Sequence, residues 1–234
     1  MNSKTTFFLG LFLTISIFVI SNLLSRITIL TYNFIPATFT IHSLMLILSI
    51  LAIVYFAKKG WLKFHFKPVK FRYYITGILI ALAGFVLANI ISTIILLAFG
   101  LPILPKGNGL SSIAGMSFIQ FFLFVFIYAS ICEEILFRGF LQNFLEPLKI
   151  YGFTITKNLR ISFPVIISGV LFGLAHLVLL FTNTDSTIIL RTVIMTMIIG
   201  IIAGYFQEKH QNILPSIAVH MTANLPGLII ILLS

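Results

Sequence analysis

The most unusual residues in this sequence are two adjacent carboxylates, Glu133 and Glu134, near the end of a long apolar stretch. The whole chain has five acidic residues, and an ionisable group in a hydrocarbon environment is costly enough to be a functional candidate by default. On an α-helix, Glu134 and Arg138 lie on one face at positions i and i+4, whereas Glu133 points about 100° away. We therefore predict that Glu134 and Arg138 neutralise each other and that Glu133 is free for chemistry.

Two later apolar stretches also place polar groups on one helix face. Phe172 and His176 are at i and i+4 in the first of them, and His220 and Asn224 have the same spacing in the second. Polar groups within a membrane should face one another or a water-filled cavity. We therefore expect the two histidines and the asparagine to converge with Glu133.

Such a cluster predicts a hydrolase for an amide or ester bond. A buried carboxylate such as Glu133 acts as a general base on a water molecule, which a neighbouring histidine helps to hold. A second histidine and an amide donate hydrogen bonds to the developing oxyanion. Glu133, His176 and His220 could equally bind a divalent metal such as Zn²⁺, and since the chain has no HExxH motif, both schemes stay open at this point.

Other functions are compatible with the same residues. Cys132 could be the nucleophile of a thiol protease, although it should point about 100° away from Glu133 and free cysteines are commonly small buried hydrophobes. A small transporter would also bury such groups, but it would usually show repeated halves. A catalytically silent immunity or scaffold protein is the third alternative. His42, alone in an earlier apolar stretch, is interpreted as a hydrogen-bonded core residue.

The elements that must position these residues are transmembrane helices. The 234-residue chain is 59% hydrophobic and 9% charged, with a mean hydropathy of +1.15, which is far outside the range of soluble domains. Its continuous apolar runs predict an all-α, polytopic transmembrane bundle of about seven to eight helices. The seven expected spans are 6–24, 34–57, 74–99, 113–137, 161–181, 187–206 and 213–233, and an eighth segment could lie near 101–110 or 140–151.

Basic residues predict the orientation of the bundle. Six of them lie between Lys58 and Arg72, in the loop after the second span, and three more follow the fourth span. Short cytoplasmic loops are enriched in Lys and Arg, so we expect these loops and the N-terminus in the cytoplasm, with only Arg26, Lys106 and Arg191 outside. The net charge of +10 is thus a topology signal and not a nucleic-acid surface. The first stretch is longer than a signal-peptide core and is expected to be retained.

Small residues predict that the fifth and sixth spans pack closely. Each contains a Gly-xxx-Gly pair, Gly169 with Gly173 and Gly200 with Gly204. Such pairs allow helix backbones to approach each other in a membrane.

Taken together, the three motifs resemble those of a known family. They are EExxxR at 133–138, FxxxH at 172–176 and HxxxN at 220–224. In order and spacing they are similar to the motifs of the CPBP (CAAX protease and bacteriocin-processing) intramembrane proteases, which include the CAAX prenyl endopeptidases of the Rce1 type and bacterial relatives also called Abi proteins. The resemblance covers about residues 113–233.

The resemblance implies an intramembrane endopeptidase acting on a membrane-associated protein or peptide, in CAAX-type processing or in bacteriocin or leader-peptide processing and self-immunity. It implies that Glu133 and His176 activate water and that His220 and Asn224 form the oxyanion site. The supporting residues that it implies are Glu134, Arg138 and Phe172. Family members are described both as metalloproteases and as metal-independent glutamate proteases, so the resemblance leaves a Zn²⁺ site of Glu133, His176 and His220 open.

The resemblance also divides the chain within one integral membrane domain. Residues 1–110 carry N-terminal transmembrane helices and the basic loop, and residues 111–234 form the protease core. Expected partners are the lipid bilayer and a membrane-associated substrate. We expect a multi-pass protein of the cell membrane whose N-terminus and active-site opening are cytoplasmic.

The depth of His176 is difficult to reconcile with a straight fifth span. If Arg160 marks the inner membrane boundary, His176 lies roughly 24 Å along its helix, deeper than Glu133 and His220. We therefore expect this helix to be tilted or to begin outside the bilayer.

Overall fold

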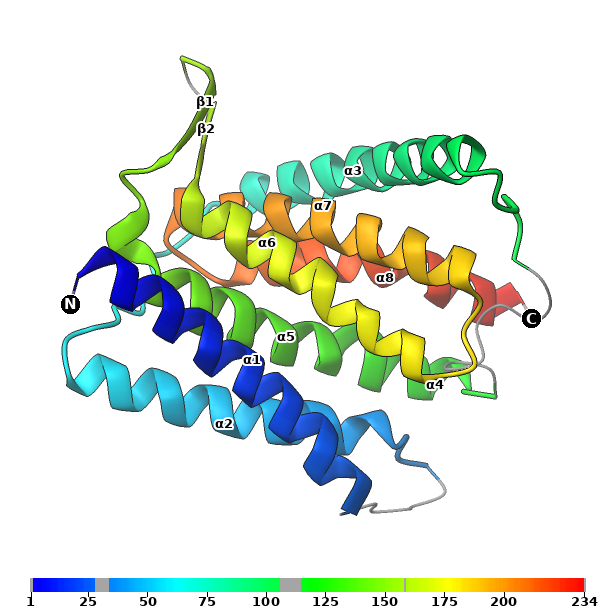
Figure 1. Cartoon of the computed structure of the whole chain (residues 1–234), viewed down its shortest axis with the longest axis horizontal. Coiled ribbons are helices and arrows are strands. Elements are labelled where there is room, and N and C mark those ends of the chain that lie inside the picture. The colour runs from blue at the N-terminus through cyan, green and yellow to red at the C-terminus, as the bar shows by residue number, and fades with distance from the viewer. Residues whose placement is uncertain (1, 28–33, 106–114, 158, 234) are drawn as a thin grey trace.

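The computed structural model describes residues 2–27, 34–105, 115–157 and 159–233, and these form a bundle of long helices (Figure 1). Within them, seven helices are long and apolar enough to cross a membrane, which confirms the predicted all-α transmembrane fold. The seven are α1 (Ser3–Ile27), α2 (Thr38–Lys58), α3 (Phe71–Ala98), the fourth helix (Phe118–Gln142), α6 (Phe163–Ala175) continued by η4 (His176–Phe181), α7 (Ser186–His210) and α8 (Leu214–Leu233).

The fourth helix carries the two adjacent carboxylates and is irregular. It begins as α4 (Phe118–Gln120), and its α-helical turn α5 (Ser130–Glu134) lies between two π-helical stretches, η1 (Phe121–Ala129) and η2 (Ile135–Gln142). Stretches of π-helix within α-helices are frequent at functional sites. The irregular geometry therefore coincides with the segment that the sequence indicates for chemistry.

The two positions considered for an eighth span hold no membrane helix among the described residues. After the fourth helix the chain forms the short 3₁₀ helix η3 (Glu146–Leu148) and an antiparallel hairpin of β1 (Gly152–Thr156) and β2 (Leu159–Ser162). Residues 101–105 are not helical. Residues 106–110, which include Lys106, lie outside the described residues. The expected span start at 113 lies outside them as well.

The hairpin, which the sequence analysis did not predict, determines where the fifth span begins. Arg160 belongs to strand β2, and helix α6 starts at Phe163. The Ser162 hydroxyl caps the new helix by accepting a hydrogen bond from the backbone N–H of Val165, and Pro164 occupies its first turn. The helix therefore starts later than expected, which shortens the path from its first residue to His176 to about 20 Å.

The loops gather at the two ends of the bundle. The N-terminus, the loop between α2 and α3 and the β1–β2 hairpin lie at one end, and the C-terminus lies at the other (Figure 1). We call the first end the basic end, because it carries the basic residues Lys4, Lys58, Lys59, Lys63, Lys67, Lys70, Arg72, Lys149, Lys157, Arg160 and Lys209. Among the described residues, the opposite end carries only Arg26 and Arg191. The charge asymmetry predicted from the sequence is therefore an asymmetry of the folded bundle.

Helices α6 and α7 pack through the predicted glycines. A Cβ atom added at Gly169 would lie 2.7 Å from a backbone nitrogen of α7, and one added at Gly200 would lie 3.0 Å from Cα of Gly169. Larger residues would force the helices apart. The absence of side chains at Gly200 and Gly204 also lets Arg138 and Gln142 approach this stretch of α7. The carbonyl groups of the two glycines accept hydrogen bonds from Arg138 Nη2 at 2.8 Å and Gln142 Nε2 at 2.9 Å.

The second half of the fourth helix lies at the centre of the bundle. Leu136, Phe137, Phe140 and Leu141 are at most 2% exposed and belong to a core cluster that also includes residues of α1, α2 and α6. A helix surrounded in this way holds its polar side chains at fixed positions. Those polar side chains are the residues of the candidate site.

Candidate active site

A cavity of about 410 Å³ lies between α2, the fourth helix, α6 with η4, α7 and α8. The four residues expected to converge, Glu133, His176, His220 and Asn224, all line it, together with Phe172. The structure thus brings side chains from three separate sequence motifs to one place.

Glu133 lies between two histidines of this cavity. Its Oε1 is 3.1 Å from Nε2 of His42, and its Oε2 is 3.7 Å from Nε2 of His220. Its side chain is 18% exposed. One carboxylate oxygen is therefore held by a neighbour, while the other faces a second histidine across a gap.

The contact between His42 and Glu133 requires a proton that the two residues share. Nδ1 of His42 lies 2.7 Å from the carbonyl oxygen of Thr38, and because a carbonyl oxygen only accepts, Nδ1 carries a proton. The contact between Nε2 and Oε1 is then a hydrogen bond only if a further proton sits on one of these two atoms. The pair is an imidazolium with a carboxylate or an imidazole with a carboxylic acid.

Glu134 and Arg138 form the predicted ion pair, and both side chains are completely buried. Arg138 Nη1 donates to Oε1 of Glu134 at 2.8 Å, and the guanidinium lies over the ring of Phe172, 4.8 Å from its centroid. The same Oε1 accepts a hydrogen bond from Nδ1 of His220 at 2.9 Å. Glu134 therefore also fixes the orientation of a candidate catalytic histidine, a role beyond the one predicted.

The two histidines of the later motifs both donate hydrogen bonds through Nδ1. Nδ1 of His176 donates to the carbonyl oxygen of Phe172 at 3.0 Å, and Nδ1 of His220 donates to Glu134. In a neutral imidazole the remaining Nε2 is an acceptor. An ordered water molecule can bridge two polar groups of a protein. Nε2 of His220 and Oε2 of Glu133 are 3.7 Å apart, too close for a water oxygen to lie directly between them, but a water molecule beside the pair can donate one hydrogen bond to each.

Asn224 presents its side-chain amide to the cavity from α8. Its Nδ2 donates to Oγ of Ser130 at 3.1 Å and to the carbonyl oxygen of Val125 at 3.5 Å. The second distance is at the outer limit of a hydrogen bond. The amide can redirect this weakly used N–H to an oxygen atom in the cavity at little cost.

His42 is hydrogen-bonded, as its interpretation as a hydrogen-bonded core residue required, but it also lines the cavity and contacts Glu133, which that interpretation did not include. One signal in the sequence could have identified it, since any ionisable residue in an apolar span is a functional candidate. Its partner is 91 positions away along the chain, and only folding reveals such a contact.

Cys132 does not take part in this arrangement. Its side chain is 0% exposed and belongs to the apolar core cluster, and the described lining of the cavity does not include it. A thiol nucleophile must reach its substrate. The structure gives no support to the thiol protease alternative.

The arrangement of donors does not match a metal site. Within the described parts of the chain, no three His, Cys, Asp or Glu side chains form a group that could hold a metal ion. Glu133, His176 and His220 line one cavity without forming such a group.

The cavity extends towards the end of the bundle opposite the basic end. Thr38, Met116 and Thr184, which precede or begin α2, α4 and α7, line it together with Ile230 near the end of α8. The N-terminus lies at the basic end (Figure 1). The lining therefore reaches the end of the bundle opposite the N-terminus, because His176 lies near the far end of its span. This position does not favour the expectation that the N-terminus and the active-site opening share one side.

Comparison with known proteins identifies one family. Residues 115–226 match the family model described as type II CAAX prenyl endopeptidase Rce1-like, and this range contains Glu133, His176, His220 and Asn224 but not His42. Neither the curated proteins nor the solved structures include a match to this chain.

Proposed function

Residues 115–226 of this chain belong to the Rce1-like family of type II CAAX prenyl endopeptidases, and we propose that the protein is an intramembrane endopeptidase in which Glu133 activates a water molecule. The observation that carries this proposal is the cavity inside the bundle, where Glu133 lies 3.7 Å from His220 and shares one lining with His176 and Asn224. The substrate class is a membrane-associated peptide or protein.

A water molecule that lies beside this pair and donates to Oε2 of Glu133 and Nε2 of His220 is the nucleophile. Glu133 takes one proton from the water as the water oxygen bonds to the carbonyl carbon of the scissile peptide. The resulting oxyanion accepts a hydrogen bond from the amide of Asn224. When the C–N bond breaks, the proton on Glu133 passes to the leaving amine, and the new carboxyl group keeps the water oxygen and its second proton.

The three histidines of the cavity have different roles in this scheme. The shared proton starts on His42, so that Glu133 is a carboxylate whose Oε1 is held and whose Oε2 is free for the water. His220, oriented by Glu134, accepts the second hydrogen of the water. This gives His220 the role that the family resemblance implies for His176. His176 stays in the proposal as the histidine that lines the approach to the water.

The position of the cavity favours substrates on the outer side of the membrane. Because short loops rich in Lys and Arg are cytoplasmic, the basic end faces the cytoplasm and the opposite end, to which the cavity extends, faces outwards. Within the family's range of activities, this supports processing of an exported peptide, such as a bacteriocin or leader peptide, over processing of a cytoplasmic CAAX protein.

A proteomic comparison tests the proposed activity. Membranes from cells producing the wild-type protein or Glu133→Gln are compared, and at least one peptide should be cut only in the wild type. Glu146→Gln is the matched control, because Glu146 lies in η3 at the basic end, away from this cavity, and it should cut the same peptide. Identical peptide sets for wild type and Glu133→Gln contradict the proposal.

Removal of His42 is expected to reduce cleavage of that peptide by about 10- to 100-fold, because a hydrogen bond to a charged group contributes about 1.5–3 kcal/mol. In His42→Ala, the carboxylate of Glu133 loses the partner that holds Oε1. The rate is measured with purified protein in lipid vesicles, and His65→Ala, outside the cavity, is the control. Equal rates for the two variants would show that His42 has no part in the reaction.

Metal chelation is expected to leave the rate of cleavage unchanged, because Glu133 and the histidines suffice in this scheme. Purified protein is treated with EDTA, dialysed and assayed with and without added Zn²⁺. Loss of activity on chelation, with recovery on adding Zn²⁺, would replace the glutamate scheme by a metal-dependent one.

The orientation predicts opposite labelling at the two ends of the bundle. In a Cys132→Ala background, a cysteine at Lys63 in the basic loop should resist an impermeant maleimide added to intact cells. A cysteine at Thr184, which lines the cavity near the opposite end, should react. The reverse pattern would place the basic end and the cavity mouth on the other sides of the membrane.

A further inference from the structure

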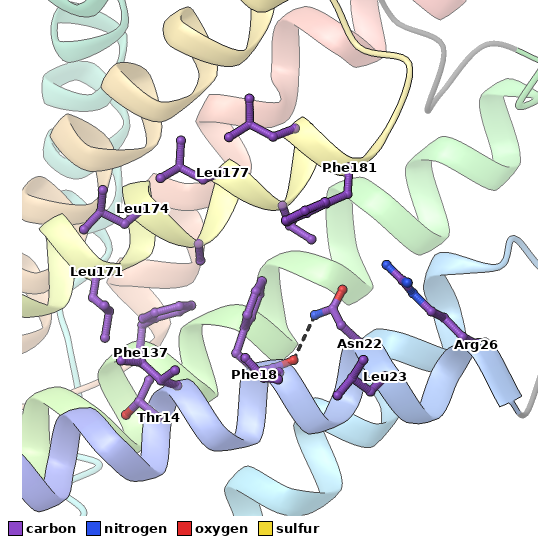
Figure 2. Close-up of a pocket in the computed structure, with 15 residues that line it drawn as sticks. Thr14, Phe18, Asn22, Leu23, Arg26, Phe137, Leu171, Leu174, Leu177 and Phe181 are labelled. Atoms are coloured by element: carbon purple, nitrogen blue, oxygen red, sulfur yellow. Dashed lines mark hydrogen bonds between the residues drawn. The ribbon is translucent and has the colours of Figure 1, made fainter.

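A second cavity, of about 480 Å³, lies on the outside of the bundle between α1 and the helix formed by α6 and η4. Figure 2 shows Phe18 of α1 and Phe181 of η4 in the space between the two helices, with Phe137 near its Thr14 end. Its lining is almost entirely apolar, with Phe18 and Leu23 from α1 and Leu174 and Phe181 from the opposite side. We call this cavity the α1 groove.

The α1 groove has one charged side chain in its described lining, that of Arg26. The Thr14 hydroxyl donates to the carbonyl oxygen of Gly10 at 2.9 Å, and Nδ2 of Asn22 donates to that of Phe18 at 2.8 Å. Arg26, at the far end of the groove (Figure 2), takes part in none of the ion pairs among the described residues. All five acidic residues of the chain come after position 132, so none lies near Arg26 in sequence.

The length of the groove matches one leaflet of a bilayer. From Thr14 to Arg26 helix α1 rises about 18 Å, close to half of the roughly 30 Å hydrocarbon core. A cation at one end of an apolar groove of this length is complementary to an amphiphile with an anionic head and a long hydrocarbon tail. In a membrane, the abundant molecule of that kind is an anionic phospholipid.

We propose that the α1 groove binds an acyl chain of an anionic phospholipid, whose phosphate group pairs with Arg26. This site is separate from the catalytic cavity, because the two linings share no described residue. The wall between them includes Phe137, which contacts Phe172 with their ring centroids 5.1 Å apart. Lipid binding in the α1 groove is independent of proteolysis, and it can be measured without a substrate.

The single tryptophan of the chain, Trp61, makes a direct test possible. It is replaced by Phe, which keeps a ring against Phe56, and one new tryptophan is introduced at Phe18 inside the groove. Phe12→Trp in the same background is the matched control, since Phe12 is on the same helix, is 65% exposed and lies outside the groove. Both proteins are placed in vesicles containing a small fraction of brominated phospholipid, which quenches tryptophan fluorescence on contact.

In the Phe18→Trp protein, brominated phosphatidylglycerol should bind about fivefold more strongly than brominated phosphatidylcholine, since one basic residue near the membrane surface contributes about 1 kcal/mol towards anionic lipid. The Phe12→Trp protein should show no preference. Adding Arg26→Gln should remove the preference at position 18, whereas Lys4→Gln, the same change at the other end of α1, should retain it. Equal quenching by both lipids at position 18 would mean ordinary boundary lipid, and no quenching by either would mean that lipid does not enter. Either result overturns the proposal.

Discussion

Glu133→Gln is expected to lower the rate of peptide cleavage by at least about 10²–10⁴-fold, the usual contribution of a general base. The glutamine keeps the shape of the side chain and can still bond to His42, but it cannot take a proton from water. The rate is measured on the peptide found in the proteomic comparison, with protein purified into vesicles. The amount of folded protein should stay close to that of the wild type.

Cys132→Ala separates this mechanism from a thiol protease. Because Cys132 is buried in the core and outside the cavity lining, its substitution should leave the rate of cleavage nearly unchanged. An inactive Cys132→Ala protein that folds normally would contradict the assignment, as would a Glu133→Gln protein that cleaves at the wild-type rate.

Arg138→Ala is expected to reduce the free energy of unfolding by about 3–5 kcal/mol, because it leaves a buried carboxylate without its counter-charge. The substitution removes the donors to Glu134 and to the carbonyl group of Gly200, both at 2.8 Å. It also removes the cation over the ring of Phe172. The loss is measured by thermal unfolding of the purified protein in detergent or bicelles. Glu134→Ala should be destabilised in the same range.

The exposed ion pair at the basic end provides the control for this prediction. Lys149 is 42% exposed and lies 3.7 Å from Glu208, and pairs of this kind contribute at most about 1 kcal/mol. Lys149→Ala should therefore unfold close to the wild-type temperature. If Arg138→Ala does the same, the buried pair is not the structural element that its geometry indicates.

The glycines of α7 acquire a second role in the folded protein. The sequence predicts Gly200 and Gly204 as contact points between helices, and the packing of α6 against α7 agrees. Their carbonyl groups also accept hydrogen bonds from Arg138 and Gln142 on the fourth helix. A buried arginine needs more acceptors than one carboxylate offers, and a helix without side chains at these positions lets the donors reach its backbone.

The class of the protein, a count of seven to eight membrane spans and the pairing of Glu134 with Arg138 could all be predicted from the sequence, and the structure has seven spans in its described residues. Amino-acid composition indicates whether a chain is a membrane protein, and the length of each continuous apolar stretch indicates whether a helix can cross the bilayer. Positions i and i+4 share a helix face whatever surrounds the helix. These properties are local, so they can be derived without knowing how the helices pack.

The groups that meet in the site and the direction of the cavity depend on tertiary packing, and they could not be derived from the sequence. The contact of His42 with Glu133 joins residues 91 positions apart, and that of His220 with Glu134 joins residues 86 positions apart. Such contacts depend on the tilt and rotation of whole helices, which are set by packing against their neighbours. The direction of the cavity likewise follows from how far along each helix its lining residues lie. Neighbouring spans run in opposite directions, so a residue's position along its own helix gives its depth relative to residues of other helices only after the helices have been packed together.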